Sequence, residues 1–105
     1  MAQRAELGEA LLEAVDHGLL VPGEIVRAAI YARIENSREL KREEIPEKLE
    51  TFHQALQDLI GGGAKVMEKL IARNLYSRLG LNFIEHANWS IVDYVNHARR
   101  VGRGV

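Results

Sequence analysis

Residues 64–79, AKVMEKLIARNLYSRL, decide the fold. The apolar side chains of this segment spread over about two-thirds of a helical wheel at 3.6 residues per turn. A surface helix buries a narrower stripe, so this breadth indicates a central helix with neighbours on several sides. Gly61, Gly62 and Gly63 precede the segment and Gly80 follows it, which places a turn at each end. We therefore predict a central hydrophobic helix over residues 64–79.

The rest of the chain divides at Gly and Pro into four further helical segments. We predict helices over residues 2–16, 22–36, 46–60 and 91–101. No segment shows the bounded, alternating run of β-branched residues that is typical of a strand. The predicted fold class is therefore all-α: a compact bundle of about five short helices, with the helix over residues 64–79 at its centre.

The two ends of the chain are expected to lie outside this bundle. Gly18 can adopt the left-handed conformation that ends a helix. We therefore place residues 1–18 at the periphery, as a helix with a docking or pairing role. Residues 99–105 are rich in arginine, and we expect a frayed basic tail there.

The helix over residues 22–36 has apolar or small residues on more than one side. The predicted buried stripe consists of Ile25, Val26, Ala29, Ile30 and Ile34. Ala28 and Ala32 form a second, flat side, which would let a neighbouring helix approach closely.

Length and composition bound the class of protein. The chain has 105 residues, of which 47% are apolar and 28% charged, so a single globular domain over residues 1–105 is expected and intrinsic disorder is excluded. The net charge of −1 argues against an obligate polyanion binder. Residues 64–105 are nevertheless basic, with seven basic and three acidic side chains, whereas residues 1–63 have seven and twelve.

The absence of cysteine excludes disulfides, thiolate metal sites and thiol catalysis. It also fits a cytosolic protein. The N-terminus shows no apolar core of a signal peptide, and no stretch approaches the ~20 apolar residues of a membrane span. We therefore expect a cytoplasmic protein without a membrane partner.

Nothing in the sequence predicts catalysis. The four histidines lie in four different segments: His17, His53, His86 and His97. Glu50-x-x-His53 matches half of a di-iron carboxylate site, but such a site needs a second copy and two more glutamates on facing helices. The helix over residues 64–79 offers only Glu68. We assign no catalytic, cofactor-binding or metal-binding residues, and we expect a protein that is not an enzyme and needs no cofactor.

A basic strip supports one candidate function. Lys65, Lys69 and Arg73 repeat every four residues on the central helix, and Arg99 and Arg100 add charge near the C-terminus. These side chains would contact an acidic partner or, as an alternative function, the phosphates of a nucleic acid. The helix is too apolar for a recognition helix, so a small nucleic-acid-associated accessory protein is the weaker hypothesis.

Surplus apolar surface supports the stronger hypothesis, which is that the chain binds a protein. Five short helices leave part of their apolar faces uncovered, and we name five candidate interface residues: Ala28, Tyr31, Ala32, Trp89 and Tyr94. We therefore predict a non-enzymatic protein-interaction or regulatory module whose partner is a protein or a second copy of the chain. A homodimer is plausible because such faces often pair symmetrically.

A set of motifs also resembles a known family. The stretch EEIPEK at residues 43–48 is followed by Phe52, Leu56, the glycines at 61–63 with Ala64, Glu68, Leu75 and Gly80, and by IVDYV at residues 91–95. This pattern is similar to a poorly characterised archaeal all-helical domain family, although Ile60 stands where an aromatic residue is expected. Some members stand alone and others are output modules of signalling or regulatory proteins. The resemblance covers residues 25–98 and implies an archaeal regulatory role.

Overall fold

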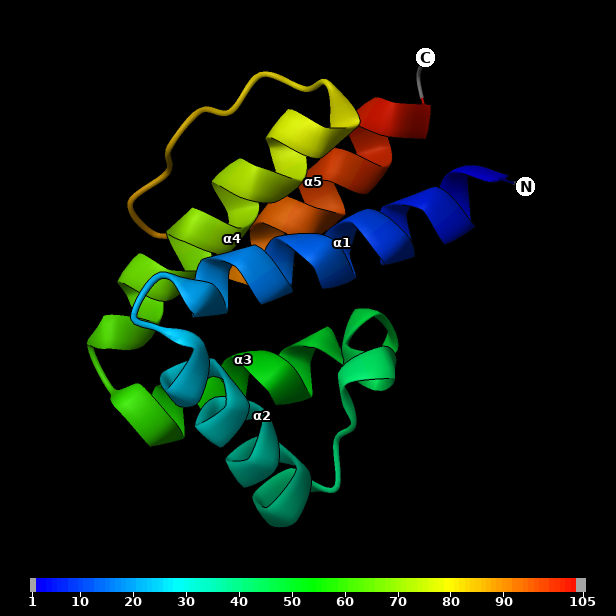
Figure 1. Cartoon of the computed structure of the whole chain (residues 1–105). Helices are drawn as coiled ribbons and strands as arrows, with labels where there is room; N and C mark the ends of the chain where they lie inside the picture. Colours follow the sequence, from blue (N-terminus) through cyan, green and yellow to red (C-terminus); the bar gives the residue numbers. More distant parts are fainter. Residues whose placement is uncertain (1, 104–105) are drawn as a thin grey trace.

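The computed structural model describes residues 2–103, and within them the side chains of residues 6–102. The helices are α1 (Ala2–Leu20), α2 (Glu24–Arg38), the 3₁₀ helix η1 (Arg42–Glu47), α3 (Leu49–Ile60), α4 (Gly63–Leu79) and α5 (Ile91–Arg103). The described residues contain no strand. The prediction of an all-α bundle of about five helices is therefore confirmed (Figure 1).

The helices pack in two layers, with α1, α4 and α5 in one and α2, η1 and α3 in the other (Figure 1). Within the first layer, α1 runs antiparallel to α4. Gly18 near the end of α1 faces Ile71, and Glu13 one turn earlier contacts Arg78 near the end of α4. This pair forms the most extensive helix–helix contact of the molecule.

α5 runs parallel to α4, which requires a long connection between them. Near the start of both helices, the backbone N–H of Ile91 donates to the Glu68 carboxylate at 3.0 Å. Further along, the Tyr76 hydroxyl donates to the Tyr94 carbonyl at 2.7 Å. Residues 80–90 return along the outside of the pair as an irregular strap (Figure 1).

α1 is not peripheral, and the expectation that it would be is wrong. Leu11, Val15 and Leu19 are completely buried. Gly18 does not end the helix but continues it, and its missing side chain lets Ile71 of α4 come close. The helix therefore extends its apolar face by one turn beyond the predicted end and covers α4.

The predicted basic tail is also partly helical. Residues 99–103 belong to α5, while residues 104–105 lie outside the described part of the chain.

One cluster of buried side chains joins both layers, and every helix contributes to it. Its largest completely enclosed members include Phe52, Leu56, Ile71, Leu75 and Tyr94. The central helix contributes on several sides, as its broad apolar arc indicates. Gly80 has a φ of 72° and ends α4 in the left-handed conformation, as the sequence predicts.

The third helix begins later than predicted. Pro46 lies inside η1 rather than at the first turn of α3, because Lys48 leaves the helical conformation with φ −129° and ψ 50°. The turn is held by the Glu44 carboxylate, which accepts from the Lys41 backbone N–H at 3.0 Å. Ile45 lies in this 3₁₀ helix, between α2 and α3, and its side chain is buried.

The carboxylate of Asp16 joins the two layers through hydrogen bonds. Its carboxylate accepts two hydrogen bonds from the Arg42 guanidinium, at 2.9 and 2.6 Å, and a third from the Tyr31 hydroxyl. Partial burial would raise the pKa of Asp16, but the hydrogen bonds from Arg42 and Tyr31 and the positive charges nearby together lower it below its ordinary value. α1, α2 and η1 thus meet at one charged group.

We expect Asp16→Asn to lower the free energy of unfolding by about 1–2 kcal/mol at neutral pH, because hydrogen bonds to a charged group are lost. The folded pKa lies below the ordinary value of 3.8, so this stabilisation is fully present above that value and is lost as the pH falls through the folded pKa. Urea unfolding over a pH series measures it. The difference between wild type and Asp16→Asn should shrink towards about pH 3 and below.

Asp58→Asn serves as the control, because the ion pair of Asp58 with Arg38 is mostly exposed. We expect a change within about 0.5 kcal/mol at every pH. A deficit of Asp16→Asn that stays constant with pH would contradict the role of the Asp16 charge.

Candidate interaction surface

Of the two aromatic candidates near the C-terminus, Tyr94 belongs to the core and Trp89 packs against it while half-buried. Tyr94 is 1% exposed, and its hydroxyl accepts from the His86 backbone N–H at 2.8 Å and donates to the His86 carbonyl at 3.2 Å. Trp89 is half-buried, stacks on the His86 ring at 3.8 Å and meets Tyr94 edge-on. The assignment of Tyr94 to an interface is therefore wrong, because this side chain fastens the strap to α5.

The three candidates on α2 have different environments. Ala28 and Ala32 are exposed on the outer face of α2. Tyr31 is half-buried and its hydroxyl is engaged with Asp16. Burial and the Asp16 carboxylate raise the pKa of Tyr31 above its ordinary value. Tyr31 thus supports the fold, while the two alanines remain available to a partner.

The basic strip on α4 is partly neutralised by the strap. The Lys69 ammonium lies 2.5 Å from the Glu85 carboxylate, and the Arg73 guanidinium lies 3.9 Å from it. The hydrogen bond and charge of Lys69 lower the pKa of Glu85. Arg73 also lies over the Phe83 ring. Lys65, by contrast, is exposed and has no ion-pair partner among the described residues.

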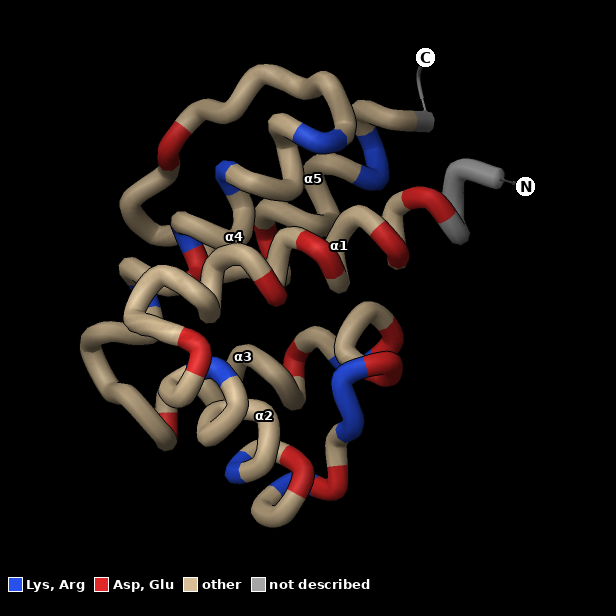
Figure 2. Tube along the Cα trace, in the orientation of Figure 1, with Lys and Arg blue, Asp and Glu red and all other residues tan. Residues whose placement is uncertain are grey.

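Arg99 and Arg100 do not extend this strip into one patch. Both are exposed near the end of α5, whereas Lys65 stands at the beginning of α4. Because the two helices are parallel, these positive charges lie near opposite ends of the pair (Figure 2). The basic side chains of α4 and α5 are thus spread along the two helices and do not gather in one patch.

Several apolar residues that the sequence predicts to be buried on α2 are exposed in the structure. Ile25 is 86% exposed and Val26 is 41% exposed, so their assignment to the buried stripe of α2 is wrong. Ile34 is buried, and nine residues at 100° per residue place Ile25 on the opposite side of the helix. Val21 is 68% exposed in the turn before α2.

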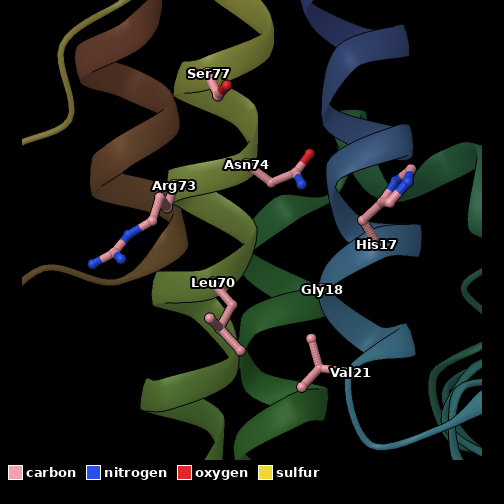
Figure 3. Close-up of a pocket in the computed structure, with 7 residues that line it drawn as sticks. All are labelled: His17, Gly18, Val21, Leu70, Arg73, Asn74 and Ser77. Carbon is pink, nitrogen blue, oxygen red and sulfur yellow. The ribbon is translucent and has the colours of Figure 1, made fainter.

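A shallow hollow lies beside this turn, between the end of α1 and the middle of α4. Its volume is about 290 Å³. Its lining residues are His17, Gly18, Val21, Leu70, Arg73, Asn74 and Ser77. Val21 and Leu70 point towards one another across it, and Arg73 points away (Figure 3). The hollow therefore has an apolar floor and a polar rim.

The rim is held by Arg78. Its guanidinium donates to the Glu13 carboxylate and the Asn74 side-chain oxygen, both at 2.6 Å, and to His17 Nδ1 at 2.8 Å. Nδ1 of His17 also lies 3.0 Å from the Glu13 carbonyl oxygen, so this nitrogen either accepts from Arg78 or donates to Glu13. These bonds fix the orientation of α1 on α4 beside the hollow.

We define the corner surface as the exposed apolar residues at the end of α1, in the α1–α2 turn and at the starts of α2 and α4, together with the half-buried Leu70, which lines the hollow with Val21. Val66 is 63% exposed and lies one turn before Leu70 on the same side of α4. The corner surface consists of Leu20, Val21, Ile25, Val26, Val66 and Leu70. Exposed apolar groups that gather in this way mark interaction sites. Helical spacing could have found Ile25, whose position opposite Ile34 is visible in the sequence.

A mostly buried hydrogen bond between a carboxylate and a histidine lies on the other side of α4. Glu68 is 4% exposed, and its carboxylate meets His53 Nδ1 at 2.6 Å as well as the N–H of Ile91. A carboxylate that orients a histidine occurs in catalytic triads. Here the second carboxylate oxygen holds the first turn of α5, so the pair joins α3, α4 and α5. Glu68, which the sequence offers without a matching metal ligand, thus has a structural role.

No group of three or more His, Cys, Asp or Glu side chains in the described part is placed to hold a metal ion. Among the described helices, none combines the length and apolar character that crossing a bilayer requires.

Comparison with protein-family models, with curated proteins and with solved structures finds no match to this chain.

Proposed function

We propose that this chain is a non-enzymatic protein-interaction module with a regulatory role, and that it binds its partner through the corner surface. The observation that carries the proposal is the exposure of several large apolar side chains at one corner, led by Ile25 and Val21. Burying such groups against a partner removes apolar area from water, at about 25 cal/mol per Å². The regulatory part rests on the resemblance of residues 25–98 to the archaeal family.

The basic strip supports a protein partner better than a nucleic acid. Lys69 and Arg73 already share the carboxylate of Glu85, so part of their charge is compensated within the chain. A nucleic-acid site needs several cations that face phosphates together, and its affinity scales with the number neutralised. Val66 and Leu70 add an apolar line beside the strip, and such a combination suits a protein surface.

Site-specific photocrosslinking tests this function. A benzoyl-phenylalanine at position 25 replaces an exposed apolar side chain and leaves the core unchanged. Added to a lysate of the cells that produce the protein, this variant should form a discrete adduct with one protein. Excess unlabelled chain should compete with it, and nuclease treatment should not affect it. Val66→Asp in the same variant should abolish the adduct, because it places a charge in the corner surface.

The control carries the same crosslinker at position 9, because Glu9 is exposed on α1 away from the corner. Equal labelling from both positions, or an adduct that nuclease removes, would contradict the proposed function.

A further inference from the structure

Two outer faces of the chain are complementary in charge and both apolar at their centres. On α2, Ile25, Ala28 and Ala32 lie within an arc of about 60°, and Glu24 and Glu35 lie along one edge of it. All five residues are exposed. The side chain of Glu24 reaches only Arg27, at 3.8 Å. In the described part of the chain Glu35 has no ion-pair partner. This part of the outer face is acidic and apolar, while the exposed Arg33 lies about 80° from Ile25 on the side away from the two glutamates.

The outer face of α4 has the opposite charge. Val66 and Leu70 form its apolar line, and Lys65, Lys69 and Arg73 run beside them at every fourth residue. The single carboxylate of Glu85 compensates only part of this charge.

The turn between α1 and α2 connects the two faces. Val21 lies in this turn and lines the hollow with Leu70 of α4 (Figure 3), and the outer face of α2 begins three residues later, at Glu24. A surface that carries both an acidic and a basic half can pair with a copy of itself about a two-fold axis. Each half then meets the opposite half of the partner.

We propose that the partner is a second copy of this chain, with α2 of each copy packed on α4 of the other and the corner surface at the two-fold axis. The small side chains of Ala28 and Ala32 let α4 of the second copy approach closely. Glu24 and Glu35 then face the basic strip, while Ile25 packs with the Val66–Leu70 line. The inference rests on the proposed function and names its partner.

Charge-reversed variants test this pairing by sedimentation equilibrium over concentration. The acid-reversed variant carries Glu24→Lys and Glu35→Lys, and the base-reversed variant carries Lys65→Glu and Arg73→Glu. Each variant alone brings like charges together at both contacts of the pair. We expect each to weaken the dimer by about tenfold or more, which corresponds to roughly 1.4 kcal/mol. An equimolar mixture of the two restores opposite charges at both contacts, so it should dimerise about as tightly as wild type.

Two controls carry the same charge changes elsewhere. Glu6→Lys with Glu9→Lys on α1 matches the acid-reversed variant, and Arg99→Glu with Arg100→Glu on α5 matches the base-reversed one; all four positions are exposed. Both controls should dimerise like wild type. Thermal unfolding of every variant separates a loss of pairing from a loss of fold.

Several results would overturn the inference: a wild type that stays monomeric, a dimer that ignores both reversals, a mixture no tighter than its components, or assembly beyond two copies. The crosslinking experiment distinguishes a failure of this inference from a failure of the proposed function. If the chain is monomeric and position 25 labels a different protein, the inference is wrong and the proposed function stands. If position 25 labels neither a second copy nor another protein, both are wrong.

Discussion

Glu68→Ala is expected to lower the free energy of unfolding by about 3 kcal/mol or more. The substitution removes a carboxylate that is 4% exposed and that is shared by His53 and the first N–H of α5. Both partners then lose their acceptor in a place that water does not fill freely, and the lost side chain leaves a cavity between three helices. Chemical denaturation followed by circular dichroism measures the change, and the melting temperature should fall by roughly 10 °C or more.

Two companion variants separate the contributions. Glu68→Gln keeps an oxygen for the Ile91 N–H and removes the charge, so its cost should be clearly smaller, about 1 kcal/mol. Glu50→Ala removes an exposed carboxylate of α3 and should change stability by no more than about 0.5 kcal/mol. If Glu68→Ala were as mild as Glu50→Ala, the carboxylate would not hold the three helices together.

Gly18→Val is expected to destabilise the protein by about 3 kcal/mol, through overpacking rather than through loss of a contact. A Cβ at position 18 would lie 2.6 Å from Ile71 Cγ1 and 3.4 Å from the Ile71 backbone N. Ile71 is completely buried, so its side chain has little space in which to move away. The expected result is a lower midpoint of urea unfolding with an unchanged slope.

Alanine at two glycines of α1 gives a matched comparison with opposite signs. At Gly8 a new Cβ would meet only Pro46, at 3.9 Å, so Gly8→Ala should stabilise by up to about 1 kcal/mol through helix propensity. Gly18→Ala gains the same propensity but must displace Ile71, and it should be destabilising overall. Ile71→Ala should relieve the crowding, so the double variant should cost less than the two single variants together. If the double variant costs as much stability as the two single variants together, the close contact between Gly18 and Ile71 is contradicted.

The all-α fold was predictable because its strongest signals are local. The breadth of the apolar arc over residues 64–79 and the glycines at its ends depend only on that segment, and α4 follows the prediction within one residue. Gly18 shows where local reasoning fails. Glycine suits both a helix stop and a close helix crossing, and the choice depends on Ile71, which is 53 positions away.

The candidate surface was predictable only in part. Ala28, Ala32 and Lys65 are exposed as a surface role requires, but partners from distant segments decide the remaining cases. Glu85 compensates Lys69 from the strap, and the backbone of His86 occupies the hydroxyl of Tyr94. An amino-acid type that suits an interface suits a small core equally well, so composition could not distinguish the two for Tyr94.

The parallel course of α4 and α5 has a consequence for how the C-terminal third holds together. A helix that follows its neighbour antiparallel can fold back through a short turn, but α5 must first be carried back along the length of α4. The backbone of such a return segment has no regular ladder to join, and here the Tyr94 hydroxyl supplies both a donor and an acceptor to His86. The first turn of α5 likewise donates a backbone hydrogen bond to Glu68 of α4. The strap and α5 are therefore held by each other's hydrogen bonds and by Glu68, and we expect the two segments to become ordered together.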